Sequence, residues 1–422
     1  MYAAAALVIG HILDGRYEML RPIGGGGMGS VYEARHRGTG RRVAVKVLSG
    51  SFLRNESVLT RFQREAKAAG SIQSQYITEV LDTGVDPTTG QPYIVMEHLD
   101  GEDLGQALHR VKVLSPDTAL RIAAQTTLGL SRAHEARVIH RDIKPGNLFL
   151  ARRESGELTL KICDFGVAKI VADRLQDIEK SGLTQTGSVL GSPLYMSPEQ
   201  ARGNKDIDPR SDLWSLGIVL YQMLSGRRPH EDIDALGELI IAICSEPPRP
   251  LQDVAPWVPP EVAAVVHGAL HFEPARRFQS AAEMLEAMRP LLQNGWSLDA
   301  SMILPISEGE RLVVAPRLDL TAAEAAMQGA TPAISLDGQR SPFASGPDFR
   351  GSNANLEPTI AEAPLTDLIR TPGSPSALSA PAAVPGVERA PTGGRARAVL
   401  WLMLLLLAGL IVVLAVLLKS RG

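Results

Sequence analysis

The sequence has few aromatic residues and almost no cysteine. Aromatic side chains make up 5% of the 422 residues, which indicates that part of the chain does not form a packed core. The two cysteines, Cys163 and Cys244, are far apart, which excludes a disulfide framework and fits a reducing compartment. No Cys and His spacing suggests structural zinc. A formal net charge of −3 argues against a protein that neutralises many phosphates, so no nucleic-acid partner is expected.

The composition changes along the chain and predicts a folded part followed by a linker. After an N-terminal extension, 1–15, residues 16–293 carry most of the aromatics and nearly all the regular apolar patterning. Residues 294–398 are rich in Pro, Ala, Ser, Thr and Gly and bury too little apolar surface to offset the entropy of ordering a backbone. We predict a disordered linker there, in which only 312–326 is patterned for a short helix.

Residues 399–418 form an apolar run of twenty residues without a charge. At 1.5 Å per residue a helix of this length spans about 30 Å, the thickness of the bilayer hydrocarbon, so we predict a single transmembrane helix in contact with membrane lipid. A buried core helix is the alternative, disfavoured because only the short tail 419–422 follows. The N-terminus lacks a basic region, so no signal peptide is predicted. We therefore expect the folded part on the cytoplasmic side of the inner membrane and no outer sensing domain.

A glycine-rich stretch follows a strand predicted over 17–23. It has the spacing G-x-G-x-x-G-x-V, formed by Gly24, Gly26, Gly29 and Val31. Glycines let backbone amides approach phosphate oxygens, although the pattern alone is also that of a flexible turn. A dinucleotide-binding fold would place a helix directly after the glycines. Here a turn separates strand-like residues 30–35 and 42–48, which predicts a β-hairpin instead.

The second strand of this hairpin carries a lysine on the face opposite its valines. Alternation along 42–48 places Ala44 and Lys46 together on that face. A strand lysine commonly faces solvent, but one that binds phosphate needs a carboxylate to hold its flexible stem. Glu65 is the candidate, in a helix predicted over 59–69, although taken alone it is more simply interpreted as a solvated helix charge.

Two later segments bring together oxygen-bearing side chains. Residues 138–150 contain Asp142 and Asn147, and residues 160–166 contain Asp164. The side chains of Asn147 and Asp164 suit Mg²⁺, a hard cation that prefers oxygen ligands. Asp142 is then free to orient a hydroxyl group.

Taken in this order and at these separations, the motifs resemble those of the eukaryotic-like (Hanks-type) Ser/Thr protein kinases, the bacterial membrane-anchored branch in particular. The resemblance covers about 16–292. It implies an α+β, bilobal protein kinase fold with a β-rich N-lobe and an α-helical C-lobe. It also implies ATP and Mg²⁺ (or Mn²⁺) as cofactors, and transfer of the γ-phosphate to Ser or Thr hydroxyls of protein substrates and of the chain itself.

The same resemblance implies roles for individual residues. Asp142 would accept the proton of the substrate hydroxyl, and Lys144 would support the γ-phosphate. Asn147 and Asp164 would hold the metal. Residues 97–99 would form the hinge, with Met96 as the gatekeeper. The residues expected to contact ATP, or to orient the lysine that does, are Gly24, Gly26, Gly29, Val31, Ala44, Lys46, Glu65, Met96, Glu97, Leu99 and Phe149.

Further residues are expected to support or regulate this site. By resemblance, Asp212 braces the catalytic-loop backbone and Arg277 pairs with Glu199. Thr184 and Thr186 are predicted phosphosites, with Ser188 a weaker third, although Ser and Thr are also common in ordinary loops. Arg141, next to Asp142, offers a guanidinium for such a phosphate. Trans-autophosphorylation would involve a second copy of the chain, as in a dimer.

Two other functions remain as alternatives. One is a pseudokinase scaffold that binds nucleotide or partners without catalysis. Such scaffolds usually lack the equivalents of Lys46, Asp142 or Asp164, all of which are present. The other is a small-molecule kinase, which lacks the long segment that ends here in Pro198-Glu199.

Overall fold

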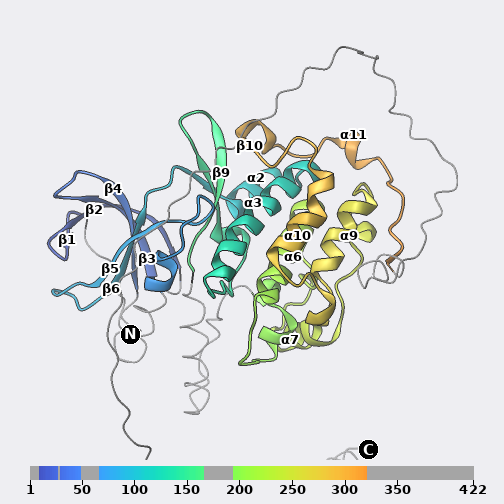
Figure 1. Ribbon diagram of the computed structural model, residues 1–422, viewed down its shortest axis with the longest axis horizontal. Coiled ribbons are helices and arrows are strands. Elements are labelled where there is room, and N and C mark those ends of the chain that lie inside the picture. The colour runs from blue at the N-terminus through green and yellow to red at the C-terminus, as the bar shows by residue number, and fades with distance from the viewer. Residues whose placement is uncertain (1–8, 27–28, 49–65, 166–192, 321–422) are drawn as a thin grey trace, which may run out of the picture. The chain divides into compact units, whose positions relative to one another are not determined.

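The computed structural model describes residues 9–26, 29–48, 66–165 and 193–320, which lie in one compact unit. In these residues the chain forms a β-rich lobe, drawn blue to cyan in Figure 1, and a helical lobe, drawn green to orange. We call them the N-lobe and the C-lobe. The bilobal α+β fold predicted from the motifs is therefore confirmed.

The N-lobe is built on a six-stranded antiparallel sheet with the strand order β1-β2-β3-β4-β6-β5. Strands β3 and β4 pair as the hairpin predicted after the glycines, and β2, which was predicted over 17–23, extends to Gly26 and pairs with the other side of β3. The strands are β1 (Ile12–Leu13), β2 (Tyr17–Gly26), β3 (Gly29–His36), β4 (Arg42–Leu48), β5 (Val80–Val85) and β6 (Pro92–Glu97).

Both faces of this sheet are covered, which explains why β4 is apolar on both sides. Val43, Val45 and Val47 pack into one cluster with residues of β1, β2 and β6. Ala44 packs on the opposite face into a second cluster with Ala66, from the helical residues 66–70. The predicted alternation along β4 is thus confirmed, and Lys46 lies on the Ala44 face.

The C-lobe is mostly helical and surrounds the largest apolar cluster. Its longest helix, α3, has Ser115 as its N-cap and Pro116 in its first turn, a favourable start for a helix. The helices are α2 (Leu104–Val111), α3 (Pro116–Glu135), α5 (Pro198–Ala201), α6 (Arg210–Ser225), α7 (Leu236–Ser245), α8 (Leu251–Val254), α9 (Pro260–Ala269), α10 (Ala281–Met288) and α11 (Glu308–Arg311), with short 3-10 turns between some of them.

A second, four-stranded sheet lies on the C-lobe next to α3, in the order β10-β9-β8-β7. It comprises β7 (Gly101–Asp103), β8 (Leu148–Arg152), β9 (Glu157–Ile162) and β10 (Leu298–Asp299). The hairpin of β8 and β9 matters for function, because Asn147 precedes β8 and Asp164 follows β9. The two ends meet where Cys163 N donates to Asn147 O at 2.8 Å.

Residues 296–318, which we call the strap, pack against the C-lobe. β10 adds to β9 in antiparallel register, with Leu298 opposite Leu158. Ile303 and Ile306 are buried, and Ile306 N donates to Val113 O at 3.1 Å. Further along, Leu318 N donates to the side chain of Gln252 at 2.7 Å.

The strap corrects the prediction that a disordered linker begins at residue 294. The prediction was based on the low apolar content of 294–398 as a whole and overlooked a few well-spaced apolar residues at its start. The surface of the C-lobe buries these residues. Residues 313–319 are not helical, so the short helix considered over 312–326 does not begin at Leu312. The remainder of the predicted linker lies outside the described residues.

None of the helices in the described part of the chain is long and apolar enough to cross a bilayer. The transmembrane helix predicted over 399–418 lies outside that part.

Candidate active site

The glycine-rich turn is placed by the pairing of β2 with β3. Gly24 lies opposite Val31, and Gly26 lies opposite Gly29 at the end of the hairpin. A Cβ on Gly29 would lie 2.2 Å from Val47 O, so close packing against β4 requires glycine there. A Cβ on Gly24 would meet only Val31, at 3.8 Å. The fold itself therefore does not require glycine at 24, which fits a position kept bare for a ligand.

Lys46 is buried on β4 and reaches across the two lobes. Its Nζ lies 2.7 Å from Oδ1 of Asp164, beyond the end of β9. No pattern in the sequence predicted that Asp164 pairs with Lys46, because the two residues are distant along the chain. The prediction that Glu65 holds Lys46 lies outside the described residues.

The electrostatics of this pair favour a charged Asp164. Burial acts to raise the pKa of the carboxyl group, but the charge and hydrogen bond of Lys46 outweigh burial and hold the pKa below its usual value. Asp164 is therefore a carboxylate at neutral pH. The backbone of Asp164 has φ of +65°, which turns the chain sharply at this point.

The catalytic loop, residues 140–147, brings two predicted residues, Lys144 and Asn147, to the Asp142 carboxylate. Lys144 Nζ lies 2.6 Å from Asp142 Oδ2. Asn147 Nδ2 donates to the same oxygen at 3.0 Å and to the Asp142 backbone oxygen at 2.7 Å. Both bonds of Asn147 use its nitrogen, which leaves the amide oxygen as a ligand atom. Asp142 and Lys144 are both partly exposed, as a substrate hydroxyl would require.

Asp212 braces the backbone of this loop, as the resemblance implied. Its carboxylate accepts from Arg141 N at 2.7 Å and from His140 N at 2.9 Å. His134 Nε2, 2.9 Å away, donates to it as well. Burial acts to raise the pKa of Asp212, but the hydrogen bond from His134 and the charges nearby leave it lowered. His134 was not identified from the sequence, because a single helix histidine carries no motif.

His140 links the catalytic loop to the segment that carries Asp164. Its Nε2 lies 2.7 Å from Cys163 O, and its ring meets Phe165 edge-on at 4.6 Å between centroids. Its Nδ1 accepts from Asp142 N at 3.2 Å. His140 thus joins Asp142 to the residues on either side of Asp164, a role that the sequence analysis did not assign.

The predicted adenine-binding residues share one face of the N-lobe sheet. Ala44 lies opposite Met96 on neighbouring strands, and Val31 packs against the cluster that contains both. Phe149 lies on β8 of the C-lobe, half-buried, in register with Lys161 of β9. The three N-lobe residues are brought together as predicted.

The hinge side chain at 97 has a structural partner. Glu97 Oε1 accepts from Lys161 Nζ at 2.6 Å and from Glu79 N at 2.9 Å, so its carboxylate joins the N-lobe to β9. Because the side chain of Glu97 is already bonded, any contact of Glu97 with a nucleotide would be made by its backbone. Leu99, the other predicted hinge contact, is half-buried.

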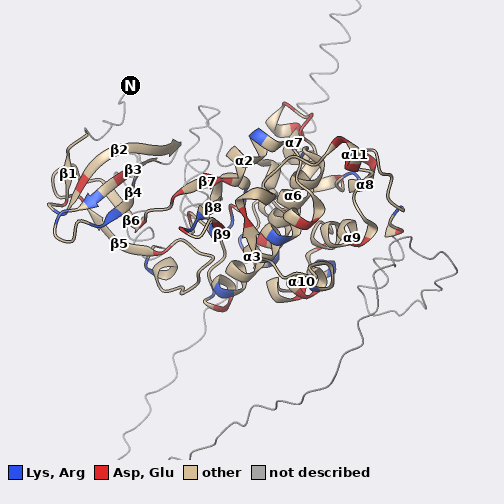
Figure 2. Cartoon of the chain, turned by 90° about the horizontal axis from the view of Figure 1, so that it is seen from above, with Lys and Arg blue, Asp and Glu red and all other residues tan. Residues whose placement is uncertain are grey.

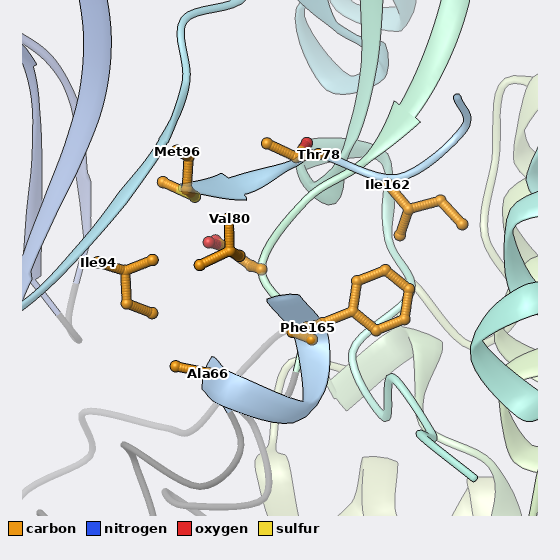
Figure 3. Close-up of a pocket in the computed structure, with 9 residues that line it drawn as sticks. Ala66, Thr78, Val80, Ile94, Met96, Ile162 and Phe165 are labelled. Carbon is orange, nitrogen blue, oxygen red and sulfur yellow. The ribbon is translucent and has the colours of Figure 1, made fainter. Parts of the chain in front are cut away.

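A small, mainly apolar pocket lies behind Met96 and reaches the site (Figure 3). Thr78, Val80 and Ile94 from the N-lobe line it, together with Asp164 and Phe165 from beyond β9. Figure 3 shows the Phe165 ring next to Ile162, on the C-lobe side of the pocket. Met96, the predicted gatekeeper, thus lines an apolar space that lies next to the Lys46 and Asp164 pair.

Charged residues of both signs are interspersed over the described elements (Figure 2). One buried pair of opposite charges supports the site from the C-lobe. Arg277 makes two hydrogen bonds with Glu199, of 2.7 and 2.8 Å, as the resemblance implied. Ser211 Oγ also donates to Glu199 at 2.6 Å. The guanidinium of Arg277 stacks on Trp214 at 4.8 Å. This pair anchors α5 to α6.

The donor set fits a divalent cation held together with a nucleotide. Asp164 offers a carboxylate and Asn147 an amide oxygen, and Mg²⁺ commonly uses one or two such ligands plus substrate phosphates and water. Within the described ranges no cluster of three or more His, Cys, Asp or Glu forms a metal cage. The residues therefore suit a metal that arrives with phosphates. Thr184 and Thr186, the predicted phosphosites, lie outside the described residues.

In this site Lys46 and Asp164 meet between the lobes, and a second carboxylate, that of Asp142, lies beside Lys144 and Asn147. Such an arrangement defines a nucleotide-dependent phosphotransferase. Comparison with known proteins agrees. Residues 17–288 match the Protein kinase domain family. The chain belongs to this family.

Named relatives and solved structures indicate which type of protein kinase the chain resembles. The chain is 38% identical to serine/threonine-protein kinase PknB of Mycolicibacterium smegmatis, over 73% of this chain and 48% of that protein. It is 39% identical to serine/threonine-protein kinase PknA of Mycobacterium tuberculosis, over 66% and 62%. The crystal structure of the Mycobacterium tuberculosis PknI kinase domain matches with a TM-score of 0.53 and 29% identity, over 68% of this chain and 99% of that one. The matched region is thus a serine/threonine protein kinase domain, and it spans about half the length of the curated relatives.

Proposed function

We propose that the protein transfers the γ-phosphoryl group of ATP to Ser and Thr hydroxyls of protein substrates. Supporting this is the arrangement in which Lys46 of the N-lobe meets Asp164 of the C-lobe, beside the carboxylate of Asp142. The named relatives are serine/threonine-protein kinases, which supports the choice of hydroxyl.

The reaction needs positioning and countercharge more than a strong nucleophile, because the transition state is loose and its charge is spread over peripheral oxygens. Lys46 would neutralise the α and β phosphates, and Lys144 the γ-phosphate. Asp142 would orient the substrate hydroxyl and accept its proton as the new O–P bond forms and the bond to the β-phosphate breaks, releasing ADP. Mg²⁺ held by Asn147 and Asp164 would supply further positive charge to the phosphates.

The test is incubation of the full chain with labelled ATP, Mg²⁺ and a generic protein substrate. We expect labelled Ser or Thr in the wild type and label near background in Lys46→Met, since the substitution removes the phosphate-binding ammonium group. If both proteins leave the substrate and themselves unlabelled, the kinase proposal is wrong and the scaffold alternative gains support. Omitting Mg²⁺, or replacing it with Mn²⁺, tests the choice of cation.

We also propose that autophosphorylation takes place on Thr184 and Thr186, between neighbouring copies. The position of Arg141 supports this, because a guanidinium beside the catalytic aspartate can bind a phosphorylated loop. Mixing active chain with a longer, tagged Lys46→Met chain should label the inactive copy. Label confined to the active copy would argue against transfer between copies.

Membrane attachment through 399–418 is proposed from its charge-free apolar sequence alone. The kinase domain would then act at the cytoplasmic face of the inner membrane. Full-length protein should sediment with membranes and resist carbonate extraction, whereas a variant lacking 399–418 should remain in the supernatant. Equal distribution of the two proteins would contradict the proposal.

A further inference from the structure

The carbonyl oxygen of Arg141 is held by a side chain from outside the catalytic loop. Gln200 Nε2 donates to it at 2.9 Å. Gln200 lies on α5, which follows the segment that carries the predicted phosphosites. No motif in the sequence pointed to this residue.

Arg141 needs such support because its backbone is strained. Its φ is +68°, in the left-handed region that costs a non-glycine residue of order 1–3 kcal/mol. Such a conformation persists only when its surroundings fix it. Asp212 accepts from the N–H of Arg141 at 2.7 Å, and Gln200 holds its carbonyl group. The residue is thus held from both sides.

The peptide between Arg141 and Asp142 determines where the Asp142 carboxylate points. Its carbonyl group is bound by Gln200, and its N–H donates to His140 Nδ1 at 3.2 Å. If this peptide rotated, the Asp142 side chain would turn away from Lys144 and from a substrate hydroxyl. Displacements of about 1 Å at a reacting group can lower rates by about a hundredfold.

The two ends of the Gln200 amide have separate partners. The nitrogen binds Arg141, whereas Oε1 accepts from Ser197 N at 3.0 Å and closes the capping box of α5. Ser197 Oγ in turn accepts from Gln200 N at 3.3 Å. A role in capping the helix and a role in holding the loop can therefore be separated by substitution.

We propose that Gln200 is a positioning residue for phosphoryl transfer, which holds the peptide between Arg141 and Asp142 and so aims the Asp142 carboxylate at the substrate hydroxyl. The inference rests on the proposed kinase function. Because the bond is made to the catalytic loop and not to the N-lobe residues that contact ATP, its loss lowers kcat and leaves the KM for ATP unchanged.

The test compares Gln200→Glu with Ser197→Ala in the full chain, by steady-state kinetics on a generic protein substrate. Gln200→Glu keeps an oxygen for the capping box, which accepts Glu or Gln equally, but replaces the donor to Arg141 with an acceptor. We expect kcat to fall about tenfold or more, with KM for ATP unchanged. Ser197→Ala weakens the cap but keeps the bond to Arg141, and its kcat should stay within about twofold of wild type.

The dependence of kcat on pH, relative to wild type, distinguishes a positioning role from a capping role, because loss of the cap alone would not make this relative kcat depend on pH. A protonated carboxyl group can donate to the Arg141 carbonyl, whereas a carboxylate cannot. The Arg141 carbonyl oxygen disfavours a carboxylate placed against it and so raises the pKa of the introduced carboxyl group. The ratio of the kcat of Gln200→Glu to that of wild type should therefore rise as the pH is lowered from 8 to 6. In Gln200→Ala, which has no proton to gain, the same ratio should stay constant.

Wild-type kcat in Gln200→Glu, or a loss in Ser197→Ala as large as in Gln200→Glu, would overturn the inference. Thermal unfolding of each variant shows whether it is folded. If Gln200→Ala is not folded, the test is made with Gln200→Glu. The difference in kinase activity between wild type and Lys46→Met is the reference for these comparisons. If that difference is absent, it is the kinase proposal that fails.

Discussion

The side-chain nitrogen of Gln125, on α3, donates a hydrogen bond of 2.7 Å to the backbone carbonyl of Trp296 in the strap. Its Oε1 accepts from Leu160 N of β9 at 2.8 Å, so one buried amide joins the strap to the strand that leads to Asp164. Arg121, also buried, donates to Ser297 O at 2.9 Å. The strap therefore satisfies polar groups of α3 that have no access to water.

Removal of the strap should destabilise the kinase domain. Ending the chain after residue 295 deletes Leu298, Ile303 and Ile306 and exposes the apolar surface that they cover; each contributes about 1.5–3 kcal/mol when fully buried. It also removes the Ser297 partner of Arg121. We expect the melting temperature to fall by about 10 °C or more in differential scanning fluorimetry.

A chain ending after residue 320 is the matched control for this truncation. It retains the strap, and its melting temperature should equal that of the full chain. Equal melting temperatures for chains ending at 295 and 320 would show that the strap contributes nothing to stability.

Asp142→Asn should lower kcat by about 10²–10⁴-fold, the usual contribution of a positioned acid or base. The amide keeps the size of the side chain but cannot accept the hydroxyl proton. The KM for ATP should change little, because Asp142 contacts the catalytic loop and not the N-lobe. The exposed Asp206→Asn provides the control and should have wild-type kinetics. An Asp142→Asn variant with comparable kcat would mean that this carboxylate is not the proton acceptor.

Glu199→Ala should destabilise the fold by about 3–5 kcal/mol at pH 7, measured by urea unfolding. It leaves the Arg277 guanidinium, whose side chain is fully buried, without its carboxylate. Glu238→Ala on α7 removes an exposed carboxylate and should have an effect below about 0.5 kcal/mol. Similar losses in the two variants would mean that the buried pair is not important for stability.

The same pair predicts how stability depends on pH. Burial acts to raise the pKa of Glu199, but the hydrogen bonds and charge of Arg277 outweigh it and hold the pKa below the ordinary 4.5. A carboxyl group with a lowered folded-state pKa contributes stability above its ordinary pKa and loses it as the pH falls through the folded value. The difference in unfolding free energy between wild type and Glu199→Ala should thus be constant from pH 7 to about 5 and shrink below 4.5. A difference that is unchanged at pH 3.5, where both proteins still show a transition, would contradict this.

Cys163 should resist alkylation although it lies next to Asp164 in the candidate active site. Burial raises the pKa of its thiol to about 12, and the thiol lies 3.0 Å from Thr78 Oγ1. Only a thiolate reacts readily with iodoacetamide, so the native chain at pH 8 should be modified at Cys244 and not at Cys163. Mass spectrometry of the digested protein gives the answer, and urea-unfolded chain, modified at both, is the control. Rapid modification of native Cys163 would show that the thiol is accessible and ionised.

The hairpin and the motif residues could be predicted from local sequence. Strand β4 coincides with the predicted range 42–48, because its alternation and the turns around it depend on near neighbours. The assignment of Asn147 and Asp164 as metal ligands came from their oxygen-bearing side chains and stays a prediction; the structure places the two residues at the ends of the hairpin of β8 and β9. The strap could not be predicted in this way, since its few apolar residues have meaning only against the surface of α3 and β9.

By itself, the sequence determined the hairpin of β3 and β4, the order of the motifs and the chemistry that the motif residues can perform, because these depend on side-chain type and on contacts between near neighbours. The two lobes were implied by the resemblance of the motifs to a known family. Tertiary structure alone decided that Lys46 faces Asp164, that Gln200 holds Arg141 and that Gln125 reaches Trp296. Each of these bonds joins residues distant along the chain, and only the packing of the elements brings their atoms within hydrogen-bonding distance.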